Sequence, residues 1–187
     1  YITDASDNYT QTNFDSNDEY NKFLENPTEE NLIRTIMANF ILEGIYFYSG
    51  FMFFYNLERN GKMPGSAQEI RYINRDENTH LWLFRNIMRE LQREEETLFT
   101  DELKEELREM MRCGVENEIN WGHYVIGDNI QGINKNMIES YIKYLGNKRL
   151  KEIGLTPLYE GYDKNPANWV DTLSDANSVK TDFFEAK

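Results

Sequence analysis

Two ionisable motifs on neighbouring predicted helices constrain this chain more than any other feature. Glu43 lies in the most apolar stretch, around residues 41–55, and Glu77 stands 34 positions later as the first residue of Glu-x-x-His, which ends at His80. Residues three apart share one face of a helix, so the Glu77 and His80 side chains converge. A carboxylate on one helix and Glu-x-x-His on the next form half of the ligand set in the core of carboxylate-bridged di-iron helix bundles. We find no second Glu-x-x-His and no fourth candidate acid, so the sequence predicts half of a metal site.

The neighbours of these residues favour a metal over an ordinary polar couple. Leu81 and Ile73 lie at helical-neighbour positions to Glu77, and Phe40 lies one turn from Glu43. An ionised carboxylate on an apolar face is unfavourable unless a cation or hydrogen bonds compensate its charge. A neutral imidazole together with carboxylates suits iron or manganese. A hydrogen-bonded or solvated Glu–His couple without a metal is the alternative that the spacing alone leaves open.

Apolar residues recur at helical spacing along most of the chain, and no strand pattern exceeds a few residues. We expect four helices: from the Asn26-Pro27-Thr28-Glu29 start signal to about Arg59, from the Ser66-Ala67-Gln68-Glu69 capping box to the acidic run at 94–96, from Thr100 to about Ile126, and from about Lys135 to Ile153. Gly154 is well placed as the stop of the last helix. The predicted fold class is therefore all-α.

The composition divides the chain into three segments. Residues 1–31 are rich in Asp, Asn, Ser and Thr, and we expect a connecting segment that lies on a surface or a partner. Residues 32–153 contain the helical periodicity and the candidate ligands, so they form a helical bundle portion with half of a metal site. Residues 154–187 contain two prolines with several Asn and Asp, and are expected to form an extended tail.

Charge and composition argue against several classes of protein. The 33 Asp and Glu against 20 Lys and Arg leave a net charge of −13, whereas nucleic-acid-binding proteins usually show a basic patch. No stretch reaches about 18 consecutive apolar residues, the length expected of a membrane span, and the start lacks the features of a signal peptide. We therefore expect a soluble, cytoplasmic protein without nucleic-acid or membrane partners. The first residue is Tyr rather than Met, which suggests a trimmed or incomplete chain.

Two other residues with metal-binding potential are interpreted as structural. His123 has Asn120 and Ile119 at the positions where a helical partner acid would stand. Cys113 is the single cysteine, which excludes a disulfide within the chain and fits a reducing compartment. An isolated thiol is usually buried and inert, so we expect Cys113 to pack between helices.

Longer motifs surround the candidate ligands. Residues 42–51 read Leu-Glu-Gly-Ile-Tyr-Phe-Tyr-Ser-Gly-Phe, and residues 73–81 read Ile-Asn-Arg-Asp-Glu-Asn-Thr-His-Leu. These segments resemble the third ligand helix and the Arg-Asp-Glu-x-x-His helix of the small, radical-generating subunit of class I ribonucleotide reductase. Motifs at 132–134, 141–142, 147–150, 153–155 and 165–169 follow the order found in that family. The resemblance covers roughly residues 30–187 and implies a ferritin-like di-metal carboxylate helical bundle.

The resemblance implies a role for each candidate ligand. Glu43 matches a terminal metal ligand, Glu77 matches a carboxylate that bridges two metals, and His80 matches a terminal imidazole ligand. The implied cofactor is a dinuclear metal centre, either Fe/Fe or Mn/Fe.

Neighbouring residues match the radical pocket and the radical-transfer relay of the family. Phe47, Phe51 and Ile73 match the apolar pocket that shields the oxidised centre from solvent. Asp76 matches the acid that links a metal-bound histidine to the radical-transfer chain, and Arg75 stands beside it. An apolar shell agrees with this role, because it controls solvent access to a metal site.

The sequence departs from the family in three ways. The family's first half, with an Asp, another Glu-x-x-His and the radical-bearing Tyr or its Phe replacement, is not found here. The family's extreme C-terminal tail, with a Tyr that passes the radical to the large subunit, would lie beyond Lys187. The Tyr-Ser-Gly-Phe run and the ending at 182–187 look most like the chlamydial type, in which a manganese/iron centre replaces the tyrosyl radical.

The resemblance therefore predicts the C-terminal part of a ribonucleoside-diphosphate reductase small subunit, an oxidoreductase. Its metal centre would use oxygen to generate the radical or oxidised centre that passes to the large subunit for deoxyribonucleotide synthesis. Three partners are implied: the missing N-terminal half, as a split chain or an absent portion; the homodimer mate; and the large subunit. We expect the chain to be inactive without the missing half and the large subunit. The alternatives are a ferritin-like di-metal oxidase and a non-catalytic acidic helical interaction protein.

Overall fold

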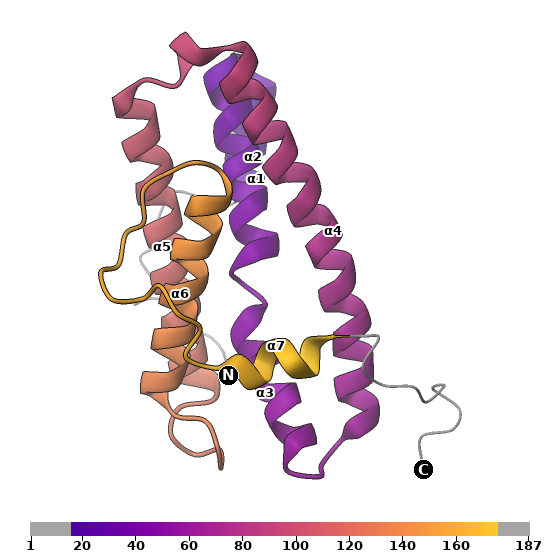
Figure 1. Ribbon diagram of the computed structural model, residues 1–187. Helices are drawn as coiled ribbons and strands as arrows, with labels where there is room; N and C mark the ends of the chain where they lie inside the picture. Colours follow the sequence, from indigo (N-terminus) through magenta and orange to yellow (C-terminus); the bar gives the residue numbers. More distant parts are fainter. Residues whose placement is uncertain (1–15, 176–187) are drawn as a thin grey trace.

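The structure, a computed structural model, describes residues 16–175. Within this range the chain forms seven α-helices and one short 3₁₀ turn, without a strand (Figure 1). The elements are α1 (Ser16–Glu25), α2 (Glu29–Gly44), α3 (Tyr48–Arg59), α4 (Pro64–Glu94), η1 (Glu96–Leu98), α5 (Asp101–Val125), α6 (Lys135–Glu152) and α7 (Asn168–Ser174). The all-α prediction is confirmed. The chlamydial-type ending at 182–187 and the first fifteen residues of the predicted connecting segment lie outside the described residues.

The consecutive helices α2 and α3 run between α4 on one side and the α5–α6 pair on the other (Figure 1). α2 packs against α4, α1 and α5, and α5 packs mainly against α6. The core is formed by apolar side chains with almost no exposed surface, among them Ile33, Met37, Met52, Leu107 and Ile142. This arrangement places the end of α2 beside the middle of α4.

Two of the predicted helix starts are wrong by a few residues. Thr28 rather than Asn26 caps α2, because the Thr28 Oγ1 accepts a hydrogen bond from the backbone N–H three residues on, at 3.2 Å. α4 begins at Pro64, directly after Met63 in a left-handed conformation (φ 50°), and not at the predicted capping box around Ser66. Proline suits the first turn of a helix, since it lacks the N–H that would be unpaired there. The helix therefore extends back to Pro64.

The other predicted helix ends agree with the structure. α4 ends at Glu94, where the acidic run begins. Thr100 caps α5, because its Oγ1 accepts a hydrogen bond from the backbone N–H of Leu103 at 3.2 Å. α6 ends at Glu152, and Gly154 follows with a φ of 77°, a left-handed conformation that glycine adopts without a steric penalty.

The largest difference from the prediction is a break inside the first helix. The sequence predicts one continuous helix, but α2 ends at Gly44 and α3 begins four residues later. Side chains from other helices pair with the backbone at the break. The Arg149 Nε donates to the Gly44 carbonyl oxygen at 3.3 Å, and a Glu118 carboxylate oxygen accepts the backbone N–H of Ser49 at 2.9 Å. Helix ends need such partners, and the local periodicity contains no sign of them because they come from α5 and α6.

The predicted connecting segment and the predicted tail each contain a helix. α1 lies in the connecting segment and packs against α2, where the Thr35 hydroxyl donates to the Glu19 carbonyl oxygen at 3.0 Å. α7 lies in the predicted tail and crosses α3 and α4 (Figure 1). The Arg71 Nε on α4 donates to the Leu173 carbonyl oxygen on α7 at 2.6 Å. The division of the chain into three segments stays a prediction.

The stretch Glu29–Arg59, which contains α2 and α3, is long and apolar enough, by length and composition, to span a membrane. In the bundle 61% of its most apolar window is buried against other parts of the chain. A helix that is apolar on all sides is found in protein cores as well as in membranes. Its composition is therefore only weak support for a membrane span.

Candidate metal centre

α2 and α4 bring the three candidate ligands together. Glu43 lies in the last turn of α2, and Glu77 and His80 lie on successive turns in the middle of α4. One ligand atom from each residue lies within 4.8 Å of the other two. The His80 Nδ1 lies 2.9 Å from a Glu77 carboxylate oxygen and 3.6 Å from a Glu43 carboxylate oxygen. The structure thus shows the convergence of side chains, and metal binding by them stays a prediction.

The two acids are largely covered, whereas the imidazole is open. The exposed fraction of the side chain is 18% for Glu43, 15% for Glu77 and 52% for His80. The candidate centre therefore lies at the edge of the described bundle, with its carboxylates against other side chains and its imidazole half-exposed.

Burial and proximity change the protonation of the candidate ligands. Burial, and next the neighbouring Glu77, raise the pKa of Glu43 to about 7. The hydrogen bond with Glu77, together with the charge of Glu43, raises the pKa of His80. Two carboxylates that share a site repel each other, which favours a proton on one of them. A divalent cation would remove this repulsion and displace the protons.

The set of donor atoms fits iron or manganese. Carboxylate oxygen and imidazole nitrogen are ligands that suit these metals. A dinuclear carboxylate centre in a helix bundle uses a Glu from each of two helices and Glu-x-x-His from each of the other two. Three such side chains converge here, so the residues present fit one half of a dinuclear centre.

Among residues 16–175, no other group of three His, Cys, Asp or Glu side chains converges in this way. The other histidine, His123, has its Nε2 3.1 Å from the Lys135 carbonyl oxygen, which agrees with a structural role. Cys113 is buried in α5, with its Sγ 3.8 Å from a Glu109 carboxylate oxygen. The described part of the chain therefore offers three metal ligands in one place.

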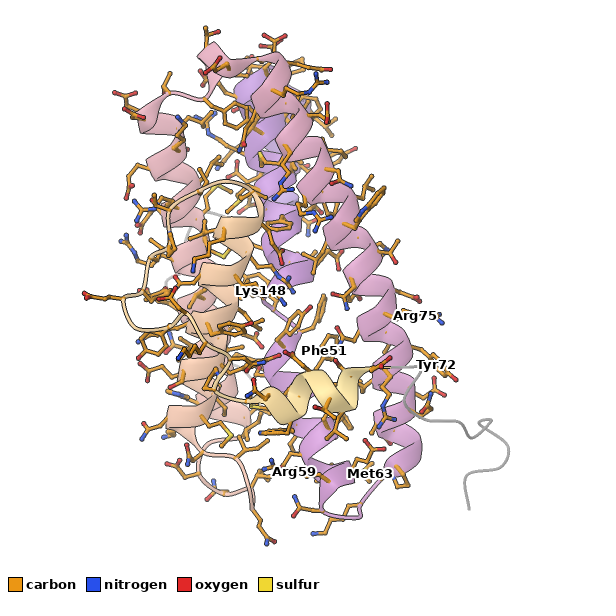
Figure 2. The ribbon with its side chains drawn as sticks, in the orientation of Figure 1. Phe51, Arg59, Met63, Tyr72, Arg75 and Lys148 are labelled. Carbon is orange, nitrogen blue, oxygen red and sulfur yellow. The ribbon has the colours of Figure 1, made fainter. Side chains whose placement is uncertain are left out.

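The predicted apolar pocket is only partly assembled in the described structure. Phe47 and Phe51 stack with ring centroids 6.2 Å apart, and Phe51 is buried inside the bundle (Figure 2). Phe47 is 38% exposed, and Ile73, one turn before Glu77 on α4, is 45% exposed. The structure brings the two phenylalanines together but leaves Ile73 uncovered.

The predicted relay residues lie on the exposed side of α4. The Arg75 Nη2 lies 3.2 Å from an Asp76 carboxylate oxygen, and both side chains are exposed. The Arg75 guanidinium also lies over the Tyr72 ring, 5.5 Å from its centroid. The Arg75 side chain projects from the outer side of the helix (Figure 2). The part of Arg75 and Asp76 in a relay stays a prediction.

A buried arginine that was not among the predicted site residues lies next to the candidate centre. Arg149 on α6 donates from Nη2 to the Tyr48 hydroxyl at 2.8 Å, in addition to its bond with the Gly44 carbonyl. The sequence does contain a signal for Arg149: it lies on an apolar helix face, because Ile142 and Leu145 precede it at helical spacing. A cation on such a face needs buried partners.

A helical bundle with a Glu on one helix and Glu-x-x-His on a second helix packed against it is typical of the class of ferritin-like carboxylate-bundle proteins. The sequence profile of the family described as "Ribonucleotide reductase, small chain" matches residues 6–166. The chain belongs to this family.

Individual relatives agree with the family match. The ribonucleoside-diphosphate reductase subunit beta of Treponema pallidum (strain Nichols) is 59% identical over 170 residues, which are 90% of this chain and 48% of the relative. The corresponding subunit of Halalkalibacterium halodurans is 44% identical over 170 residues, or 91% of this chain and 49% of the relative. The solved R2 subunit from Clostridium botulinum is 55% identical with a TM-score of 0.81, over 85% of this chain and 50% of that chain. The chain thus spans about half the length of the curated relatives it matches.

The predicted likeness to the chlamydial type is not confirmed. The subunit beta of Chlamydia pneumoniae is 34% identical over 147 residues, whereas the Treponema pallidum relative is 59% identical over 170 residues. The likeness of the Tyr-Ser-Gly-Phe run to the chlamydial type stays a prediction.

Proposed function

We propose that this chain is the C-terminal part of a ribonucleoside-diphosphate reductase small subunit, an oxidoreductase, and supplies half of the ligands of a dinuclear metal centre. The observation that carries this proposal is the convergence of Glu43, Glu77 and His80 within 4.8 Å in a member of the small-chain family. These three residues would hold part of the centre, which would supply, with oxygen, the oxidising equivalent that the large subunit needs for deoxyribonucleotide synthesis.

The proposed ligands have distinct roles. Glu43 and His80 would be terminal ligands, and Glu77 would bridge two metals, either Fe/Fe or Mn/Fe. In the structure the His80 Nδ1 lies 2.9 Å from a Glu77 carboxylate oxygen, so the two side chains already face the same place.

The neighbouring residues would keep the centre dry and connect it to the large subunit. Phe47 and Phe51 stack beside the turn after Glu43 and would exclude water there. Ile73 would complete this apolar pocket once α4 is covered. Asp76, with Arg75 beside it, would link the centre to the radical-transfer chain.

A second polypeptide, or a portion absent from this chain, would cover α4 and supply the remaining ligands. Four large apolar side chains of α4 are exposed in the described structure: Ile73, Trp82, Leu83 and Ile87. Large exposed apolar surfaces usually mark an interaction site, and about half the length of the relatives is unmatched by this chain. The further proposed partners are the homodimer mate and the large subunit, in the cytoplasm.

The experiment combines this chain with the unmatched half of the Treponema pallidum relative and measures iron and manganese by elemental analysis. We expect metal to copurify with the assembled pair and to be lost in His80→Ala. His123→Ala is the matched control and should retain the metal, because His123 contacts a backbone carbonyl. Equal metal content in His80→Ala and wild type would contradict the proposed ligand set. Failure of the assembled pair to bind a reductase large subunit would favour the oxidase alternative.

A further inference from the structure

The break between α2 and α3 begins directly after a candidate ligand. Glu43 is the next-to-last residue of α2 and Gly44 is the last, and residues 45–47 form a turn before α3. The end of a helix leaves backbone carbonyl groups without helical partners. The position of Glu43 is therefore well determined only if other groups hold the chain on both sides of this turn.

Arg149, a residue that is 4% exposed, connects the two sides of the break through its guanidinium group. Its Nε donates to the Gly44 carbonyl oxygen at 3.3 Å, and its Nη2 donates to the Tyr48 hydroxyl at 2.8 Å. Its Nη1 pairs with a Glu152 carboxylate oxygen at 3.1 Å, so its charge is neutralised inside the bundle. A buried cation is strongly unfavourable without such partners. These contacts therefore hold Arg149 in one place between the end of α2 and the start of α3.

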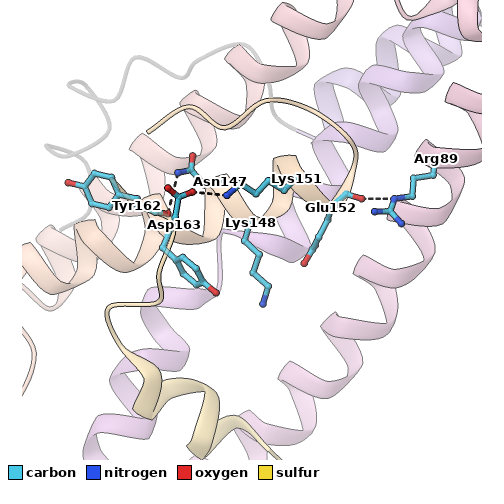
Figure 3. Close-up of a pocket in the computed structure, with 8 residues that line it drawn as sticks. Arg89, Asn147, Lys148, Lys151, Glu152, Tyr162 and Asp163 are labelled. Carbon is cyan, nitrogen blue, oxygen red and sulfur yellow. Dashed lines mark hydrogen bonds and ion pairs between the residues drawn. The ribbon is translucent and has the colours of Figure 1, made fainter. Parts of the chain in front are cut away.

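α6, the helix of Arg149, is itself tied to α4, the helix of the other two candidate ligands. The Arg89 Nε on α4 donates to the Glu152 carbonyl oxygen at the end of α6, at 2.7 Å (Figure 3). The Gln92 Nε2 donates to the next carbonyl oxygen, that of Ile153, at 2.9 Å. Through α6, Arg149 thus connects the break to α4, the helix that contains Glu77 and His80.

Gly44 lies in a narrow space between α4 and Arg149. A Cβ at this position would lie 2.9 Å from the Leu81 Cδ2 and 3.1 Å from the Arg149 Nε. Leu81 directly follows His80, and Gly44 directly follows Glu43. The close packing of Gly44 between Leu81 and Arg149 therefore sets the separation between the backbones of Glu43 and His80.

We propose that Arg149 is a positioning residue for the metal half-site. Through the Gly44 carbonyl and the Tyr48 hydroxyl, it holds the break so that Glu43 stays against the other two ligands. It acts through geometry, because its charge is paired with Glu152 rather than with the ligand carboxylates. This role rests on the proposed function of the three ligands.

Two variants test the role, each with a matched control. Tyr48→Phe removes one hydroxyl and keeps the ring, and Arg149→Lys keeps the charge but lacks the planar fork that reaches both sides of the break. Tyr55→Phe is the control for the first, because Tyr55 is a buried tyrosine of the same helix whose hydroxyl accepts one hydrogen bond, from Asn74 at 3.2 Å. Arg71→Lys is the control for the second, because Arg71 is also a buried arginine bonded to a backbone carbonyl.

The first measurement is the affinity for Co(II), with the visible absorption spectrum, in the chain assembled with the unmatched half of the Treponema pallidum relative. Loss of an outer-shell partner typically weakens metal binding by roughly 10–100-fold. We expect about a tenfold loss and an altered spectrum in Tyr48→Phe and Arg149→Lys, and wild-type behaviour in both controls. Unchanged affinity and spectrum in both variants would overturn the role of Arg149.

The second measurement is amide hydrogen exchange in this chain alone, which needs no metal. Tyr48→Phe should speed exchange of the amides of residues 44–49, and Tyr55→Phe should leave them at the wild-type rate. Wild-type exchange at these amides in Tyr48→Phe would also overturn the role. If the assembled wild type binds no Co(II), the proposed function fails, and the exchange result alone decides on Arg149. Tyr48→Phe suffices for both measurements if Arg149→Lys does not fold.

Discussion

α2 and α3 contact α5 and α6 on one side and α4 on the other, and the two sides differ in how fully their polar and apolar groups are covered. Where they meet α5 and α6, the backbone at the helix break has side-chain partners in Arg149 and Glu118, both buried. Where they meet α4, the candidate ligands lie at the edge, with His80 half-exposed and Trp82 and Leu83 uncovered further along the helix. We call these the closed side and the open side. Buried side chains on the closed side therefore hold the backbone of the helix break, whereas the candidate ligands lie at the edge of the open side.

The largest expected effect compares one leucine on each side. Leu107→Ala on α5 should lower the free energy of unfolding of the chain by about 2–5 kcal/mol, because Leu107 is fully buried and its loss leaves a cavity. Leu83→Ala on α4 should change it by no more than about 0.5 kcal/mol, because Leu83 is exposed. Denaturant unfolding of the chain alone measures both. Equal losses in the two variants would contradict the division into a closed and an open side.

The second effect concerns pH and the closed side. Burial raises the pKa of Glu118 to about 8, against the opposing hydrogen bonds from Ser49. Between about pH 5 and 8 the folded chain therefore keeps a proton on Glu118 that the unfolded chain has released. The free energy of unfolding should fall as the pH rises through this range, by up to roughly 4 kcal/mol. Glu118→Gln removes this titrating group, so the free energy of unfolding of the variant should rise relative to that of wild type across this range. Parallel stability curves for the two proteins between pH 5 and 8 would show that Glu118 is not the group responsible.

The third effect tests whether the open side is covered on assembly. Trp82→Ala should weaken binding of the unmatched half of the Treponema pallidum relative by about 2 kcal/mol, roughly 30-fold, because buried tryptophans often dominate interfaces. Tyr124→Ala, an exposed aromatic residue on α5, is the control and should leave binding unchanged. Titration calorimetry measures both. A larger loss for Tyr124→Ala than for Trp82→Ala would place the interface on the wrong side of the bundle.

The smallest expected effect compares ion pairs. Arg34 on α2 makes two bonds to Glu106 on α5, both at 2.8 Å, whereas Arg93 on α4 pairs with Glu90 of the same helix at an exposed position. Glu106→Gln should lower stability by about 0.5–1 kcal/mol at low salt, and Glu90→Gln by less. The difference should shrink in 1 M salt, which screens exposed charges. Thermal unfolding at two salt concentrations measures the stability loss of each variant. Equal losses at low salt would contradict a larger contribution of the Arg34–Glu106 pair.

Sequence reasoning was most successful where the chemistry is local. The spacing of Glu77 and His80 predicts one helix face, and the structure places them there beside Glu43. Thr100 caps the start of α5, and Gly154 follows the end of α6, so each residue lies within one turn of the helix end that it predicts. In these cases the residue itself determines the local structure, without distant partners.

What the sequence could not show depends on contacts between distant segments. The break after Gly44 is held by Arg149, 105 positions away, and by Glu118, 69 positions from its partner Ser49. α7 is likewise held by Arg71 on α4, 102 positions from the carbonyl that it binds. Helical periodicity reports only neighbours three or four positions apart, so it predicts a continuous helix across the break, and the prolines, Asn and Asp of residues 154–187 predict an extended tail where α7 forms. The roles of the pocket and relay residues stay predictions, since they depend on what covers α4.

The most direct test of the account is the metal stoichiometry of this chain alone and of the chain assembled with the unmatched half of the Treponema pallidum relative. Both are titrated with Fe(II) and with Mn(II) under identical conditions. We predict weak binding by the chain alone, because residues 16–175 bring three candidate ligands together, and a full dinuclear complement in the assembled pair. Stoichiometric binding of two metals by the isolated chain, or no metal in the assembled pair, would contradict this prediction.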